Sequence, residues 1–315
     1  MSSHNFSVER FESRLANEWD RLVLDSVNGN FLHVRSFMDY HSYRYNDESV
    51  LIRNSSDVLV AVLPACRAGS AVTSHQGLTY GGVIYNKTLG QVDVINVVRS
   101  VLDFYKSHGV KSLIYKSVPP IFRRIPGDED NFALWHLGGQ LARRDVSSVI
   151  YIGNRARMSK GRRSAIKKGF RSGVAIKRVA DPGALHELIG EVVSRHGAVP
   201  THSLEELRLI MARFPSEILA LEGRLFDELV CGAIIFDFGN VLHTQYLAAS
   251  ERGREIGALD FLLDSVINEF ESNVNYISFG ISSVDGGRTV NEGLLFQKEG
   301  FGARSLCHDV YEISF

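Results

Sequence analysis

The fold is decided by a stretch in the second half of the chain, with the sequence Ser250-Glu251-Arg252-Gly253-Arg254-Glu255-Ile256-Gly257-Ala258. The residues before it, 241–248, predict a strand. The residues after it, 258–270, carry large apolar side chains at three- or four-residue spacing and predict an amphipathic helix. A turn with glycine and arginine at a helix start presents backbone N–H groups and positive charge, and such a turn is suited to binding an anion.

Around this stretch the second half of the chain predicts an alternation of helices and strands. Helices are expected at 182–196 and 203–213, the second with Ser203 and Glu206 as a capping box. The remaining elements are a short helix at 291–299 and strands at 217–222, 228–238, 276–281 and 308–314. This order predicts an α/β fold with a mixed sheet.

The first half predicts a comparable set of elements. Helices are expected at 7–24, 92–108 and 128–137, and strands at 50–53, 58–64 and 111–117. A glycine-rich polar segment, Ser-His-Gln-Gly-Leu-Thr-Tyr-Gly-Gly, occupies residues 74–82 between apolar strands.

Length and charge distribution predict two domains. A chain of 315 residues exceeds the usual size of a single core. Between Val146 and Ala180 there are ten Lys or Arg residues and no Asp or Glu. We therefore predict domains at 1–150 and 151–315. The basic stretch is either a solvated cationic helix or a surface for a polyanion, since a bound nucleotide, coenzyme A or RNA would relieve its self-repulsion.

Composition narrows the class of protein. The net charge of −1 argues against a globally basic nucleic-acid binder, and three dispersed cysteines argue against a disulfide framework or a zinc knuckle. The polar stretch 1–14 is unlike a signal peptide, and no apolar run approaches the roughly 18 residues that span a bilayer. We expect a cytoplasmic protein without membrane partners. The scattered histidines lack metal-ligand spacing, so no metal is expected.

Four segments together resemble the GNAT acyltransferases, and among them the FemAB-like branch. They are the glycine-rich segment 74–82, the basic run 159–163 leading to Gly173 and Val174, the turn 252–258, and Asn291 to Gly302 with its Lys-Glu-Gly-Phe-Gly ending. The resemblance covers roughly residues 31–311. It implies two tandem GNAT-like domains, each a mixed, mostly antiparallel sheet flanked by helices, and the transfer of an acyl group to an amine.

The resemblance also implies a coenzyme A site in the second domain. The turn at Arg254 matches the family's pyrophosphate loop except at Leu259, where the family prefers a small residue. Arg252 and Arg254 would contact phosphates, and a backbone N–H near Tyr246 or Leu247 would stabilise the oxyanion. The cofactor-binding set is Tyr246, Leu247, Arg252, Gly253, Arg254, Glu255, Ile256, Gly257, Ala258, Asn291 and Lys298. Solvent exposure is the competing interpretation for Lys298, and plain helix packing for the turn.

Two acceptor classes are known among FemAB-like proteins, and both stay open here. The absence of a coiled-coil arm and the form of segment 74–82 favour acyl transfer from acyl-CoA to a nucleotide-linked (dTDP or UDP) amino sugar, for surface polysaccharide such as the O-antigen of lipopolysaccharide. The alternatives are a FemX-like aminoacyl-tRNA-dependent transferase acting on a peptidoglycan precursor, and an RNA-binding protein. No nucleic acid is expected unless one of these alternatives holds.

Candidate side chains follow from the chemistry of amine acylation. The attacking amine needs a proton acceptor, and a histidine near its ordinary pKa of ~6.5 suits that role. His75 is the first candidate base and His243, whose strand neighbour Gln245 would share its face, is the second. A hydrogen-bonding role in a polar loop is the competing interpretation of His75. The predicted substrate-binding set is Arg35, Tyr40, Tyr43, Arg44, His75, Tyr80, Gly81, Gly82, Lys160 and Arg163. A core tyrosine is the competing interpretation for Tyr80, and a surface patch is the competing interpretation for Arg35, Tyr40, Tyr43 and Arg44.

Overall fold

The computed structural model describes residues 6–195 and 197–315. Residues 1–5, which belong to the polar stretch 1–14, and His196, the predicted last residue of a helix, lie outside the described residues. The chain forms two compact units. The first comprises the residues up to Asp145 together with Cys307–Phe315, and the second comprises Val146–Leu306. Two long strands, β9 (Gln140–Tyr151) and β17 (Arg304–Ser314), each contain a boundary between the units.

The first unit contains two groups of strands. An antiparallel sheet has the order β1-β3-β4-β7. A second group has the order β17-β8-β6-β5-β2, in which only the β6–β8 pair is parallel. The strands are β1 (Ser7–Arg10), β2 (Asn46–Asp47), β3 (Val50–Arg53), β4 (Leu59–Leu63), β5 (Cys66–Ala68), β6 (Ala71–Thr73), β7 (Ile84–Tyr85) and β8 (Ser112–Lys116).

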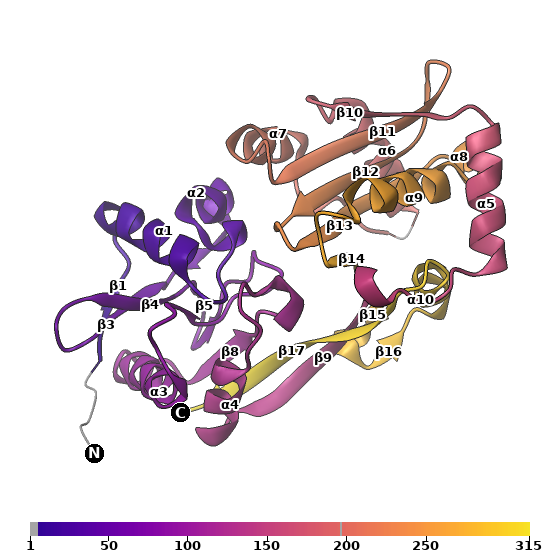
Figure 1. Cartoon of the computed structure of the whole chain (residues 1–315). Helices are drawn as coiled ribbons and strands as arrows, with labels where there is room; N and C mark the ends of the chain where they lie inside the picture. Colours follow the sequence, from indigo (N-terminus) through magenta and orange to yellow (C-terminus); the bar gives the residue numbers. More distant parts are fainter. Residues whose placement is uncertain (1–5, 196) are drawn as a thin grey trace. The chain divides into compact units, whose positions relative to one another are not determined.

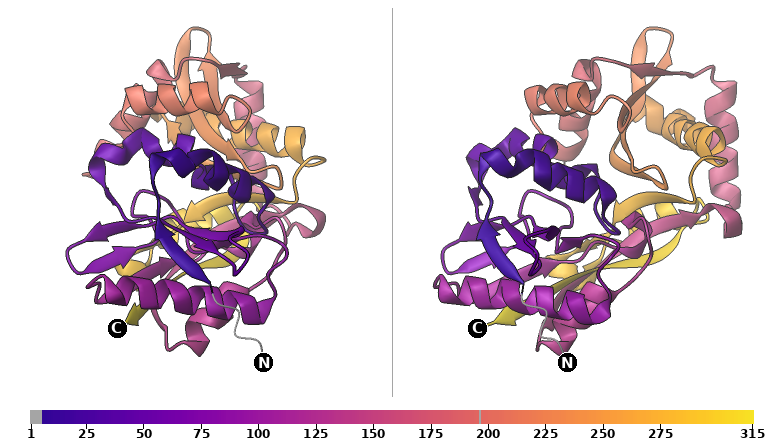
Figure 2. Two further views of the ribbon diagram at one scale, coloured as in Figure 1. Left: turned by 90° about the vertical axis from the view of Figure 1, so that its left-hand side faces the viewer. Right: turned by 60° about the vertical axis from the view of Figure 1, so that its left-hand side comes forward.

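In the described residues of this unit, four α-helices accompany these strands: α1 (Ala16–Asp25), α2 (Arg35–Met38), α3 (Gln91–Ser107) and α4 (Glu129–His136). Figure 2 shows α3 lying along the strands of its unit. Its buried face, which includes Val94, Val97, Val98 and Val101, packs in one core with strand residues such as Ile52. Each fully buried aliphatic side chain of this kind contributes about 1.5–3 kcal/mol to folding.

The second unit is built on one mixed sheet of order β10-β11-β12-β13-β14-β9 (Figure 1). The β13–β14 pair is parallel and the other pairs are antiparallel. The strands are β10 (Ala175–Val179), β11 (Ile218–Leu225), β12 (Glu228–Asp237), β13 (Val241–Ala249) and β14 (Tyr276–Ile281), with a separate small ladder of β15 (Ser283–Val284) and β16 (Thr289–Val290).

Its helices are α5 (Lys160–Arg171), α6 (Gly183–Ser194), α7 (Leu204–Arg213), α8 (Glu251–Ile256), α9 (Ala258–Phe270) and α10 (Glu292–Glu299). The buried face of α9, with Leu262, Leu263, Val266 and Ile267, joins the core formed by the strands. In Figure 1, the basic helix α5 stands beside α8 and α9. Among the described residues no helix combines the length and the apolarity that crossing a bilayer requires.

One predicted helix is wrong over its first half. Residues 7–24 were expected to be helical, but Ser7–Arg10 pairs with β3 and the α-helix begins at Ala16. The apolar spacing that suggested a helix has a different cause here, because Phe11 packs edge-on against Trp19 with ring centroids 5.5 Å apart. By contrast, α9 and β14 have the bounds that the sequence predicted.

Candidate functional site

The central feature of the second unit is a parting of two parallel strands. β13 and β14 are paired over Val241–His243 and Tyr276–Ser278, and no further pair between them is recorded in the described chain. On its other side β13 stays paired with β12, where Ile234 opposes Tyr246 and Ile235 opposes Thr244. Gln245 is therefore the extra residue of a β-bulge, a device that bends a strand and redirects its side chains. The strands form a wedge that opens beyond His243.

A pocket of about 540 Å³ lies at this wedge. Apolar side chains of β13, α9 and the segment after α10 form part of its wall, and polar groups contribute nearly as much, with charged residues at Arg162, Arg254, Asp260 and Lys298. The remaining lining residues are Val192, Leu247, Ala249, Gly253, Leu259, Leu263, Phe279, Leu294, Gln297 and Phe301. Small-molecule sites usually combine apolar walls with convergent polar groups, and this pocket has both.

Lys298 is the buried cation of this pocket. Its side chain is 6% exposed, and its Nζ donates to Gly280 O at 2.9 Å, Ile281 O at 2.7 Å and Ser282 Oγ at 2.9 Å. These three acceptors are uncharged, and burial lowers the pKa of Lys298 to about 8. At neutral pH the side chain is still mostly protonated, so it holds a positive charge in a partly desolvated wall.

The segment predicted as a phosphate-binding turn is helical instead. Residues Glu251–Ile256 form α8, with Ser250 Oγ accepting from Gly253 N as the N-cap. Arg252 points to Glu228, 2.8 Å away, and Arg254 donates to Ala249 O at 3.0 Å. The carbonyl of Glu255 accepts from Lys168. The two arginines and the Glu255 carbonyl of this segment are therefore already hydrogen-bonded or ion-paired within the protein.

Two glycines of this segment allow close packing. A Cβ on Gly253 would lie 1.9 Å from Val230 O, and one on Gly257 would lie 2.4 Å from Ala165 O. Gly257 also has φ of 73°, in the left-handed region. These glycines let α8 meet β12 and let the α8–α9 junction meet α5.

We expect Gly257→Ala to lower the free energy of unfolding by about 2–4 kcal/mol, because the added methyl group meets backbone and the left-handed φ disfavours alanine. Urea unfolding measures this change. Gly161→Ala is the matched control on α5, since nothing lies closer than 4.0 Å to its added Cβ. Equal stability of the Gly257→Ala and wild-type proteins would contradict the close packing.

The two remaining predicted residues of β13 lie on either side of the bulge. His243 is half-buried and its Nδ1 lies 3.1 Å from Ser278 Oγ on β14, at the last paired position. Tyr246 lies after the bulge, and its hydroxyl is 2.7 Å from Nδ1 of buried His202. Because Gln245 is the bulged residue, simple alternation with His243 does not hold. His202 carried no sequence signal.

Three predicted residues lie at the starts of α10 and α5. Asn291 is the N-cap of α10, where its side chain accepts from Leu294 N at 3.0 Å. Lys160 is exposed at the start of α5, and Arg163 donates to Met158 O at 3.2 Å. The other cations of α5 are mostly exposed, and the apolar side chain of Phe170 on the same helix is 69% exposed.

The predicted substrate residues before β3 divide into buried and exposed ones. Arg35 is buried over the ring of Phe11 and pairs with Asp39 and Asp47. Tyr40 is buried as well. Tyr43 and Arg44 are exposed and contact each other, with Arg44 Nε donating to Tyr43 Oη at 3.0 Å.

Segment 74–82 is packed tightly in the first unit. Tyr80 is buried, and its ring lies against Phe122. A Cβ on Gly82 would lie 2.6 Å from the ring of Tyr115, and one on Gly81 would lie 2.4 Å from Ser74 O. These glycines therefore allow backbone and ring to approach each other.

His75 is the unusual residue of segment 74–82. It has φ of 59° and is 5% exposed, and its Nδ1 is buried without a hydrogen-bond partner in the described part of the protein. Burial, followed by the charge of His41, lowers the pKa of His75 to about 3. A base this weak accepts a proton poorly near neutrality, so the environment favours a neutral imidazole that forms hydrogen bonds.

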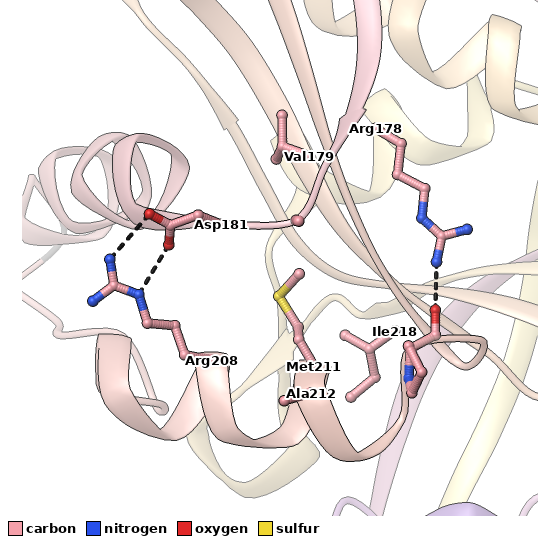
Figure 3. Close-up of a pocket in the computed structure, with 9 residues that line it drawn as sticks. Arg178, Val179, Asp181, Arg208, Met211, Ala212 and Ile218 are labelled. Atoms are coloured by element: carbon pink, nitrogen blue, oxygen red, sulfur yellow. Dashed lines mark hydrogen bonds and ion pairs between the residues drawn. The ribbon is translucent and has the colours of Figure 1, made fainter.

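A second pocket, of about 760 Å³, lies where the end of β10 meets α7 (Figure 3). Its floor is apolar, with Met211 and Ile218. Arg208 pairs with Asp181 at 2.9 and 3.1 Å, and Arg178 donates to Pro215 O. These polar groups are satisfied within the protein, so this pocket presents weaker ligand-binding chemistry than the one at the wedge. Within residues 6–195 and 197–315 no cluster of side chains suited to a metal ion is found.

The chain was compared with protein-family models, with curated proteins and with solved structures. No family model matches the chain, and no curated protein matches it. The solved structure of FemX is similar, with a TM-score of 0.68 and 10% identity, covering 98% of this chain and 97% of that one. The C-terminal domain of a putative lysylphosphatidylglycerol synthetase from Agrobacterium fabrum has a TM-score of 0.62 and 10% identity over 94% and 92% of the two chains.

L-PGS from Bacillus licheniformis gives a TM-score of 0.62 and 10% identity over 96% of this chain and 92% of that one. Such low identities show the fold alone. The predicted α/β fold, with mixed, mostly antiparallel sheets flanked by helices, is confirmed: the chain has the fold of FemX.

Proposed function

We propose that the chain is an acyltransferase that moves an acyl group from coenzyme A to an amine, with the thioester held in the pocket at the β13–β14 wedge. The observation that carries this proposal is the parting of β13 from β14 beyond His243 beside a pocket of about 540 Å³. Where a strand leaves its neighbour, its backbone N–H groups are available to a ligand carbonyl. Backbone donors fixed in this way stabilise an oxyanion without reorganising.

Lys298 supplies the positive charge in this mechanism. A neutral amine attacks the thioester carbonyl, negative charge grows on the carbonyl oxygen and then on the departing sulfur, and the amine loses a proton. An ammonium group in the same pocket wall favours both negative atoms. His243, half-buried at the mouth of the wedge, is the side chain of the second unit best placed to accept the amine's proton.

For the acceptor we propose a dTDP- or UDP-linked amino sugar, as the form of segment 74–82 suggested. Its product would serve surface polysaccharide synthesis. The support is the closely packed glycine-rich backbone of this segment, which carries His75 with unused hydrogen-bonding capacity. Polar loops that a scaffold holds in place are suited to orienting a sugar or a phosphate.

A second candidate donor, an aminoacyl-tRNA, is favoured by a specific observation. The segment expected to cradle a pyrophosphate is the helix α8, whose arginines are engaged by Glu228 and Ala249 O. The exposed cations of α5 would instead meet an RNA backbone. FemX and the lysylphosphatidylglycerol synthetase domain are the neighbours named above, and the acceptor would then be a peptidoglycan precursor or a similar amine.

A thermal-shift titration separates these donors. Coenzyme A at about a hundred times its dissociation constant is expected to add roughly 2.7 kcal/mol of stability, which raises the Tm by a few degrees. A panel of nucleotide-linked amino sugars added to the complex should raise it further for the true acceptor. No response to millimolar coenzyme A would overturn the thioester donor and leave aminoacyl-tRNA, whose binding should weaken steeply with salt.

A further inference from the structure

Lys116 is a cation that the mechanism above does not use. It is the last residue of β8 and is partly buried, and its Nζ donates to Leu78 O in segment 74–82. Among the described residues it forms no ion pair. An ammonium group has three donors, so two of them have no protein acceptor recorded. Lysine charges withdrawn from water are usually paired, so an unpaired one is suited to binding an anionic ligand.

The backbone around Lys116 is held firmly. Its own N–H donates to Ser74 Oγ at 2.7 Å, and its carbonyl accepts from Gly81 N at 2.8 Å. Ser74 N in turn donates to Ile114 O at 2.8 Å. Both ends of segment 74–82 are thus anchored to β8. The position of the lysine stem relative to the segment is therefore fixed before any ligand arrives.

His75 adds an independent observation at the same place. Its backbone is in the left-handed region and its buried Nδ1 has no partner, within the part of the chain described. The charge of Lys116 is among the causes that lower the pKa of His75, so the two groups are close enough for that charge to be felt at the ring. Strained residues with unsatisfied buried polar atoms concentrate at ligand sites.

The surrounding charges leave Lys116 as a net positive centre. Besides burial, the groups that act on its pKa are the Cys66 thiol and Arg143. Arg143 is held by Asp145 at 2.7 and 3.1 Å, so its charge is largely balanced. Cys66 Sγ accepts from Gln76 N at 3.1 Å. A compact ammonium beside a rigid polar backbone suits a phosphoryl group, which lysine binds as a point charge.

We propose that Lys116 and segment 74–82 form the phosphoryl-binding site for the nucleotide diphosphate of the acceptor. Lys116 provides the charge, and His75 provides a neutral hydrogen-bonding ring. This inference rests on the proposed function only for the identity of the molecule that carries the phosphate.

The test is isothermal titration of the full chain with UDP, dTDP and inorganic pyrophosphate, without any acyl donor. Lys116→Met and Lys116→Gln, two independent ways to remove the charge, are expected to weaken binding of the preferred probe roughly tenfold or more. Lys116→Arg should recover part of the affinity. Lys111→Met, at an exposed lysine just before the same strand, is the matched control and should bind like the wild-type protein.

A second readout separates binding from a structural role. Without ligand, the Tm of Lys116→Met should equal or exceed that of the wild-type protein, because an unpaired, partly buried charge is removed. If Lys116→Met has a lower Tm but binds the probes as tightly as the wild-type protein, Lys116 has a structural role and the proposed site is wrong. The site is also wrong if the wild-type protein binds none of the three probes at millimolar concentration. If phosphate binding depends on Lys116 while coenzyme A does not bind, the proposed donor fails and this site stands.

Discussion

Replacing Lys298 by methionine is expected to lower the rate constant of acyl transfer by about a hundredfold or more, because preorganised groups that stabilise an oxyanion are worth about that much. The substitution keeps the length of the stem and removes a buried positive charge from the wall of the pocket. It also leaves Gly280 O, Ile281 O and Ser282 Oγ without their donor. The measurement is release of free coenzyme A from acetyl-CoA in the presence of a nucleotide-linked amino sugar. Lys106→Met, an exposed lysine in the last turn of α3, is the control.

The pH dependence of the same reaction distinguishes a charge effect from a packing effect. The pKa of Lys298 is lowered to about 8, so its positive charge is lost as the pH rises through that value. The wild-type rate should fall above pH 8, and this alkaline limb should be absent from the methionine variant. A variant that is folded and as active as the wild-type protein at pH 7, or that keeps the same limb, would remove Lys298 from the mechanism.

Lowering the pH from 7 to 5 is expected to reduce the free energy of unfolding by several kcal/mol. Burial lowers the pKa values of three histidines of the first unit, to about 4 for His33, about 3 for His75 and about 4 for His308. Below an unfolded pKa of ~6.5 the unfolded chain binds protons that the folded chain does not, so stability decreases as the pH falls toward the folded values. At pH 5 each group accounts for about 2 kcal/mol.

The surroundings of each histidine ring explain why protonation is unfavourable in the folded protein. His33 Nδ1 accepts from Asn30 N at 3.1 Å, which requires the nitrogen to be unprotonated. In the described protein, His75 Nδ1 and His308 Nε2 are buried without partners. Urea unfolding at pH 7, 6 and 5 measures the effect, and His75→Asn, which tolerates the left-handed backbone, should flatten the pH dependence by about a third. Equal unfolding free energies at pH 7 and pH 5 would contradict the prediction.

Periodicity identified the elements whose side chains face one core. The helix α9 and the strand β14 were predicted to the residue, because their apolar faces are continuous. The strand β9 was not predicted, since its first half, from Gln140 to Arg144, is exposed and has no alternation of apolar and polar residues. The helix α8 was missed although Ser250 and Gly257 cap it, because a family resemblance suggested an open turn there.

The candidate site was predicted less completely, because single polar residues carry no periodicity. Lys298 was identified through the resemblance, but its neutral acceptors are carbonyls of β14 that a sequence does not reveal. Lys116 follows a buried tyrosine on a short strand, and nothing in the order of residues marks it. Arg35 appeared to be a ligand contact, yet Asp39 and Asp47 neutralise it in the core.

The return of residues 307–315 to the first unit has a consequence for synthesis on the ribosome. The strand β17 pairs with β8, so that Val310 stands opposite Lys116, yet the whole second unit is translated between them. The second unit can fold before β17 has been synthesised, and until then β8 has no partner on that edge. During that interval β8 exposes an edge to which other chains can add, so the nascent protein should depend on chaperones until its last strand emerges.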